Sequence, residues 1–251
     1  NKQATATHCN IRSFTTDPIR LIPKKKKVMR FAANRESFTT HFPALDQNRF
    51  VFLRALGKGA YGFVCSVYDR ETRQTVAIKR ISNIFASQNQ TKFVLRELKL
   101  LQYLQHNNII KLFDILPPTK KSFDDIYIMT DCMTTSMDRA IHSPSTRISA
   151  AHCKKIMYQL ITAVQHLHAR GIIHSDIKPA NILINEDVEI ELCDFGLSRV
   201  VDLANNQKSL RLSRREEVCT IWFRAPELLM RTKQYNAKID MWSIGCVLAE
   251  L

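Results

Sequence analysis

Residues 49–81 alternate apolar and polar side chains on either side of two breaks. This period of two residues is typical of β-strands that bury one face. The first break contains Gly57, Gly59 and Gly62, and the second is the polar turn at residues 69–72. We therefore expect three strands that are joined by two turns.

Later parts of the chain change to a helical period. Apolar residues recur at helical spacing in residues 88–105, with Glu97 beside the stripe, and again in residues 156–167, which are followed by Gly171. Residues 239–251 place apolar side chains all around a helix, a pattern typical of a helix buried on every side. We expect that helix to stay partly uncovered, because the given chain has no further helices that could pack over it.

Composition indicates a globular protein. The 251 residues are 45% hydrophobic, enough to bury the core of one large or two modest units. The seven cysteines are scattered and none forms a CxxC pair, which favours a reducing cytoplasmic or nuclear setting over a disulfide framework or zinc site. No stretch reaches the ~18 apolar residues of a membrane span, so we expect no membrane association.

The formal charge of +14 is unevenly distributed. The first 50 residues hold ten lysines and arginines against three acidic residues, and they show no sustained period. We therefore predict a basic, flexible extension over residues 1–48. The run from Lys24 to Lys27 resembles a nuclear-import signal, although a solvated basic run explains it equally well. Nucleic-acid binding would rest on net charge alone, and we expect no specific nucleic-acid partner.

The glycines of the first break are suited to holding phosphates. The spacing GxGxxG also occurs in dinucleotide-binding folds, where it opens a helix. Here it is followed by the β-rich residues 63–68, so the glycines should lie at the tip of a hairpin. Backbone amides at such a tip can close over phosphates, because no Cβ atom stands in the way.

Lys79 ends an apolar strand, and Glu97 lies on the following helix. Taken singly, each would be read as a surface charge. Beside a glycine hairpin, however, an ammonium held by a helical carboxylate can be directed at nucleotide phosphates.

Six short motifs then complete a pattern: GKGAYGFV from residue 57, VAIK from 76, HSDIKPAN from 174, DFG from 194, APE from 225 and DMWSIGC from 240. From about residue 49 to residue 251 the chain thus resembles the eukaryotic protein kinases. The segments VAIKRISNIF, LRELKLL, NIIKLFDI and CDFGLSRV are similar to the mitogen-activated protein kinase group. The resemblance implies an α+β, two-lobed kinase-like fold: an N-lobe with an antiparallel sheet and one helix (residues 49–131), a hinge (131–134) and a partial, mainly helical C-lobe (135–251).

The resemblance also implies roles for the motif residues in MgATP-dependent phosphoryl transfer. Asp176 would accept the proton of the substrate hydroxyl, and Lys178 would steady the transferred phosphoryl group. Asn181 and Asp194 would hold magnesium. Thr220 would hydrogen-bond to Asp176 and Lys178. The DxKxxN spacing is that of the serine/threonine class.

The nucleotide site follows from the same resemblance. It would contain the glycine-loop residues, the ammonium of Lys79, apolar residues that sandwich the adenine, and linker residues at its edge. In this sequence they are Gly57, Lys58, Gly59, Ala60, Gly62, Val64, Ala77, Lys79, Asp131, Met133 and Leu183. Glu186 and Asp187 resemble an acidic pair that docks basic peptides of protein partners, although a plain β-turn explains them equally well.

Some positions depart from the family. The Thr-x-Tyr activation pair is replaced by Arg215, Glu216 and Glu217, and Ser175 stands where most relatives have a phosphate-binding arginine. By the same resemblance, the family's other two phosphate-binding arginines are kept as Arg96 and Arg199. We hypothesise that Glu216 or Glu217 supplies fixed negative charge to Arg96, Arg199 or Arg224 instead. Ile221 replaces an arginine that shapes the preference for a following proline.

Two functions remain open at this stage. The first is an active serine/threonine kinase with protein substrates, favoured because Lys79, Glu97, Asp176 and Asp194 are all present. The alternative is a pseudokinase or docking module, favoured by Ser175 and the lost activation pair. The family's later helices are also missing after Leu251, so we expect the chain to be a fragment.

Overall fold

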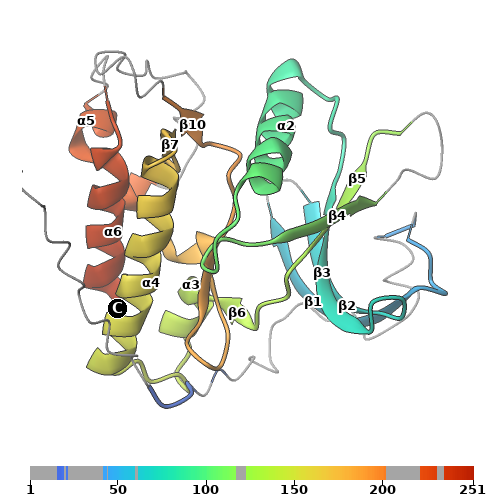
Figure 1. Ribbon diagram of the computed structural model, residues 1–251, viewed down its shortest axis with the longest axis horizontal. Coiled ribbons are helices and arrows are strands. Elements are labelled where there is room, and N and C mark those ends of the chain that lie inside the picture. Colours follow the sequence, from blue (N-terminus) through green and yellow to red (C-terminus); the bar gives the residue numbers. More distant parts are fainter. Residues whose placement is uncertain are drawn as a thin grey trace, which may run out of the picture.

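The computed structural model describes residues 16–19, 21, 42–43, 45–59, 62–116, 123–201, 221–230 and 235–251, with positions 58 and 59 as backbone only. Figure 1 shows two lobes: a β-sheet with one helix beside it, and a mainly helical part. The predicted α+β, two-lobed fold is therefore confirmed. None of the helices in the described ranges is long and apolar enough to cross a membrane.

The first lobe is built on one antiparallel sheet. Its strands are β1 (Phe50–Gly59), β2 (Gly62–Asp69), β3 (Gln74–Ile81), β4 (Leu112–Leu116) and β5 (Ile126–Thr130). Their order in the sheet is β1-β2-β3-β5-β4. The three strands expected in residues 49–81 are β1, β2 and β3, and the glycines lie at the β1–β2 connection as predicted.

Helix α2 (Gln88–Tyr103) lies beside this sheet (Figure 1). It begins after Ser87, whose hydroxyl oxygen accepts a hydrogen bond from the Gln90 backbone amide at 3.2 Å. The helix ends two residues before the predicted limit, at Tyr103. Its buried stripe includes Glu97 among aliphatic residues. The Glu97 carboxylate therefore lies between the helix and the sheet.

The second lobe combines helices with short strands. Its helices are α3 (Met137–Ile141), α4 (Ala150–His168), α5 (Pro226–Leu229) and α6 (Lys238–Glu250), with the single turns η1 (Pro179–Asn181) and η3 (Ile221–Phe223). Three strands form one small sheet, β6 (Thr135–Ser136), β8 (Ile182–Ile184) and β9 (Ile190–Leu192), and β7 (Ile172–Ile173) pairs with β10 (Arg199–Val200).

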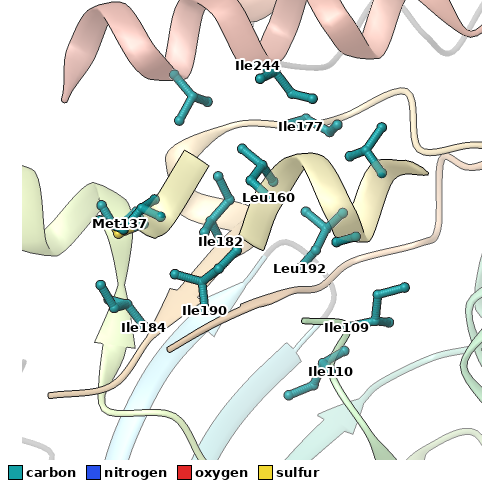
Figure 2. Close-up of a cluster of buried hydrophobic side chains, with 14 of the residues drawn as sticks. Ile109, Ile110, Met137, Leu160, Ile177, Ile182, Ile184, Ile190, Leu192 and Ile244 are labelled. Atoms are coloured by element: carbon teal, nitrogen blue, oxygen red, sulfur yellow. The ribbon is translucent and has the colours of Figure 1, made fainter. Parts of the chain in front are cut away.

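The core of this lobe lies between α4, α6 and the β8–β9 hairpin (Figure 2). Leu160, Ile182 and Leu192 are completely buried there. Burying one such side chain contributes about 1.5–3 kcal/mol. Residues 174–181, the motif HSDIKPAN, connect β7 to β8 across this core. We refer to them as the catalytic loop, and the packed core beneath them limits their movement.

Helix α6 buries one side only. Ile239, Ile244 and Val247 are buried, whereas Trp242 and Leu248 are about half exposed, at 50% and 52%. The all-round apolar pattern would suit burial on every side. Among the described elements, α6 packs mainly on α4 and η3, and within the described residues its other side leaves Met241, Trp242 and Leu248 about half exposed, as we expected.

Parts of the N-terminal extension differ from the flexible segment that we expected over residues 1–48. Ile19 and Leu21 are buried against the core of the helical lobe, and Phe42 and Leu45 are buried against the sheet. These four side chains are apolar, and packing them against apolar surfaces of the two lobes removes them from water, which is favourable. The run Lys24–Lys27 lies outside the described residues.

Candidate active site

Strand β3 and helix α2 bring Lys79 and Glu97 together. The Lys79 Nζ atom lies 2.7 Å from Glu97 Oε1, and the Glu97 side chain is almost fully buried. Burial on its own lowers the pKa of the Lys79 ammonium, but the nearby carboxylates of Glu97 and Asp194 outweigh it, so the pKa is raised. Lys79 therefore stays charged, and it is close enough to Asp194 for that carboxylate to contribute to the raised pKa.

The sheet register places the expected adenine-contacting residues on the same face as Lys79. Val64 lies opposite Lys79 in the β2–β3 pair, and Ala77 lies opposite Thr130 in the β3–β5 pair. Side chains opposite one another, or two positions apart, share a face. Val64 and Ala77 thus form an apolar surface beside the ammonium.

The glycine hairpin closes through the pair Gly59–Gly62, and Gly57 lies opposite Val64. A Cβ atom on Gly62 would lie 1.7 Å from the Arg80 carbonyl oxygen. Only glycine fits this close approach of two backbones. Ala60 and the side chain of Lys58 lie outside the described residues, so their predicted phosphate contacts stay predictions.

The catalytic-loop residues form one hydrogen-bonded group. Lys178 Nζ donates to Asp176 Oδ2 at 2.8 Å. The Asn181 amide nitrogen donates to the same oxygen at 2.9 Å and to the Asp176 carbonyl at 2.8 Å. These bonds fix the Asp176 carboxylate through Oδ2, and among the described residues no hydrogen bond to its Oδ1 is formed.

Asp240 of α6 holds the start of this loop. Its carboxylate accepts hydrogen bonds from the backbone amides of His174 and Ser175, both at 2.9 Å, and contacts His168 Nε2 at 2.8 Å. Asp240 is completely buried. Ser175 has a positive φ of 68°, a strained conformation that these bonds help to maintain.

Asp194 lies next to the loop, also with a positive φ, of 66°. The preceding amide, that of Cys193, donates to the Asn181 carbonyl at 2.9 Å. The buried His174 ring packs edge-on against Phe195, with the ring centroids 5.0 Å apart. The two predicted magnesium ligands, Asn181 and Asp194, are thus held on adjacent, bonded backbone segments.

The linker between the lobes contains Asp131 and Met133, both half-buried. Leu183 lies on β8, two residues after Asn181, and is half-buried too. A residue that we did not anticipate, Glu191 on β9, lies close to Asp131. Burial first, and then the charge and hydrogen bonding of Asp131, raise the Glu191 pKa to about 8. Glu191 is therefore protonated at neutral pH.

Three arginines make contacts around the site. We expected Arg96 to bind an activating negative charge, whereas Arg54 and Arg139 were not assigned. Arg96 on α2 donates to the Gly196 carbonyl at 2.7 Å. Arg54 donates to the Thr134 carbonyl at 3.1 Å, and Arg139 donates to the Leu56 carbonyl at 2.6 Å. The latter pair connects β1 to the linker and α3. No local sequence pattern indicates such bonds, because their acceptors are backbone oxygens far away in the chain.

Other predicted residues cannot be placed. Thr220 and the positions 215–217 lie outside the described residues. Arg199, which we expected to bind an activating negative charge, is half-buried and donates to the carbonyls of Leu197 and Ser198.

The residues present fit a magnesium ion. Both acceptors of the Asn181 amide nitrogen belong to Asp176, so the carbonyl oxygen Oδ1 of Asn181 is turned away from them. Oδ1 and the Asp194 carboxylate are hard oxygen ligands. Magnesium is usually held by one or two carboxylates together with substrate phosphates. In the described parts of the chain, no group of three or more His, Cys, Asp or Glu residues could form an all-protein metal site.

Comparison with known proteins agrees with this geometry. Residues 50–251 match the family model of the protein kinase domain. The chain is 43% identical over 204 residues to mitogen-activated protein kinase 4 of Oryza sativa subsp. japonica, an alignment that covers 81% of this chain and 53% of that protein. It is 43% identical over 197 residues to mitogen-activated protein kinase 3 of Arabidopsis thaliana, covering 78% and 51%.

A third relative is extracellular signal-regulated kinase 1 of Dictyostelium discoideum, 42% identical over 204 residues, covering 81% of this chain and 37% of that protein. The chain spans about half the length of the curated relatives it matches, or less. The match includes the sheet, the catalytic loop and α6, which together carry the site. These relatives are mitogen-activated and extracellular signal-regulated kinases, and the chain belongs to the protein kinase family.

Proposed function

We propose that this protein is a MgATP-dependent protein serine/threonine kinase. One observation carries the proposal: Lys79 is held by Glu97 and influenced by Asp194, whereas Asp176 is held by Lys178 and Asn181. Phosphoryl transfer depends mainly on positioning and charge compensation. The site supplies the Asp176 carboxylate, the ammonium groups of Lys79 and Lys178, and the oxygen ligands of Asn181 and Asp194.

In this proposal each side chain has one task. Lys79 orients the nucleotide phosphates, and the buried Glu97 keeps the ammonium in place. Asp176 accepts the proton of the substrate hydroxyl through Oδ1, because its Oδ2 is already bonded. Lys178 lies 2.8 Å from that carboxylate, where its charge can offset the charge of the transferred group.

Asn181 and Asp194 would hold the magnesium ion. When bound, the ion would neutralise phosphate charge and help to orient the nucleotide. The Cys193 amide donates a hydrogen bond to the Asn181 carbonyl. This bond keeps the backbone segments that carry Asn181 and Asp194 next to each other.

We propose serine and threonine rather than tyrosine as acceptors. Support comes from the lysine two residues after Asp176 and from the named relatives, which are mitogen-activated protein kinases. We further propose that Glu186 and Asp187 attract basic segments of protein partners, because both side chains are exposed on one turn.

The test is transfer of labelled phosphate from ATP to a generic basic protein by the purified chain. Asp176→Asn keeps the shape of the side chain but cannot accept the proton, so we expect a loss of at least about 100-fold. Asp124→Asn, an exposed aspartate outside the site, is the matched control and should keep full activity. Equal activity of wild type and Asp176→Asn would contradict the proposal, and so would an inactive wild type that melts cooperatively, which would favour the docking-module reading.

A further inference from the structure

Two arginine side chains bridge the lobes on the side of strand β1. Arg139, on α3 of the helical lobe, donates from Nη1 to the Leu56 carbonyl oxygen at 2.6 Å. Arg54, on β1, donates from Nη2 to the Thr134 carbonyl oxygen at 3.1 Å. One bond therefore runs from the helical lobe to the sheet, and the other runs from the sheet to the linker. We call these two bonds the β1 latch.

The acceptor of Arg139 lies at an irregularity of β1. The pairing with β2 passes directly from Ala55–Cys65 to Gly57–Val64, so Leu56 is an extra residue, as in a β-bulge. Such a residue is left unpaired in the ladder, which lets its carbonyl oxygen accept a bond from outside the sheet. Gly57 lies against the same guanidinium, because a Cβ atom there would be 3.3 Å from Arg139 Nη2. The β1 latch thus holds the start of the glycine hairpin.

The other end of the β1 latch has a fixed base. Met137 and Ala140, which flank Arg139 in α3, are 0% and 2% exposed and belong to the core of the helical lobe. Helix α3 also packs on η1, the last turn of the catalytic loop, and on β8. Figure 1 shows α3 and β6 on the side of this lobe that faces the sheet. A movement of β1 away from the helical lobe must therefore break both bonds.

The two arginines can affect nucleotide entry in opposite ways. Both are exposed, and in the described parts of the chain neither forms an ion pair with a carboxylate. Their positive charge would attract an anionic nucleotide and speed up its association. Their hydrogen bonds would hold the lobes together and slow association. The sign of the effect on the association rate therefore shows which property dominates.

We propose that the β1 latch controls nucleotide exchange: its bonds break when a nucleotide enters or leaves, and they form again over the bound nucleotide. This inference rests on the proposed function, in which the nucleotide lies between Lys79 of the sheet and the two aspartates of the helical lobe. Arg54 and Arg139 are positioning residues in this scheme. Since the bonds exist both before and after binding, removing one should accelerate binding and release alike and change the affinity little.

Stopped-flow binding of ATP that carries a fluorophore on its terminal phosphate, with magnesium, tests this in the full chain. For Arg139→Ala we expect association and dissociation rate constants that are both about tenfold higher than in wild type, with Kd changed less than about threefold. Arg54→Ala should change both rates in the same direction. Arg139→Lys keeps the charge and one donor, so its rates should lie between those of wild type and Arg139→Ala.

Arg170→Ala is the matched control. It removes an exposed arginine of the helical lobe that donates to the His166 carbonyl within that lobe, and its rates should equal those of wild type. Loss of an attracting charge alone would slow association in Arg139→Ala, and loss of a direct contact with the nucleotide would speed up dissociation only. Either result, or unchanged rates, would overturn the β1 latch while the proposed function stands. A wild-type chain that binds no ATP would contradict the proposed function and this inference with it.

Hydrogen exchange without nucleotide gives a second readout that does not depend on binding. The backbone pairs Ala55–Cys65 and Gly57–Val64 hold the end of β1 on β2. Amides in these pairs should exchange about tenfold faster in Arg139→Ala than in wild type, because the bond that steadies Leu56 is gone. Arg170→Ala should exchange like wild type. Equal exchange in wild type and Arg139→Ala would show that the bond does not restrain β1, and this would overturn the proposal.

Discussion

Among single residues, Glu191 should give the stability a clear pH dependence. Its pKa is about 8 in the folded protein against 4.5 for an ordinary glutamate. Between these values the folded state binds more protons than the unfolded state, so the free energy of unfolding falls as pH rises, by up to ~1.4 kcal/mol per pH unit. Glu191→Gln cannot ionise, so we expect its melting-temperature advantage over wild type to grow by up to about 7–14 °C between pH 5.5 and pH 8.5. An equal difference between the two proteins at both pH values would contradict this.

Gly62 gives a second prediction for a single residue. Gly62→Ala should push β2 away from β3, because the new Cβ atom would clash with the Arg80 carbonyl. We expect a loss of more than about 1 kcal/mol in unfolding free energy, measured by denaturant titration. Gly245→Ala is the matched control: a Cβ atom there meets nothing within 4 Å, and alanine favours the helix by about 0.5–1 kcal/mol. Similar effects of both substitutions would argue against the clash.

Among the elements, the alignment of α2 decides whether Glu97 reaches Lys79. Arg96 connects this helix to the segment that follows Asp194, because its guanidinium donates to the Gly196 carbonyl. A hydrogen bond from a charged group contributes about 1.5–3 kcal/mol. Arg96→Ala should therefore lower kcat about tenfold or more, with partial rescue by Arg96→Lys. Lys99→Ala, on an exposed position of α2, should leave kcat unchanged; if it lowers kcat as much as Arg96→Ala does, the loss is not specific to this contact.

At the scale of the whole molecule, the site exists only because two lobes meet. Lys79 comes from the sheet, whereas Asp176 and Asp194 come from the helical lobe. Arg54 and Arg139 add direct bonds from β1 to the linker and to α3. The convergence of the site is therefore a property of the folded chain as a whole.

Local patterns were enough to predict much of this arrangement. The alternation in residues 49–81 predicted β1, β2 and β3, and the helical stripe predicted α2, because each depends on neighbours in sequence. Contacts between distant residues were not predictable in this way. The Arg96–Gly196 bond, the proximity of Glu191 to Asp131 and the burial of Ile19 arise from tertiary packing. Ile19 and Leu21 in particular lie in a polar stretch without any period.

The central claim is that Lys79, Asp176 and Asp194 surround one metal-bound nucleotide. Calorimetric titration of the purified chain with ATP, with and without magnesium, tests it most directly. We predict saturable binding to wild type that is stronger with magnesium, and Asp194→Asn should lose most of the magnesium-dependent part. The absence of binding heat from a cooperatively melting wild-type chain, or identical magnesium dependence in Asp194→Asn, would contradict the claim.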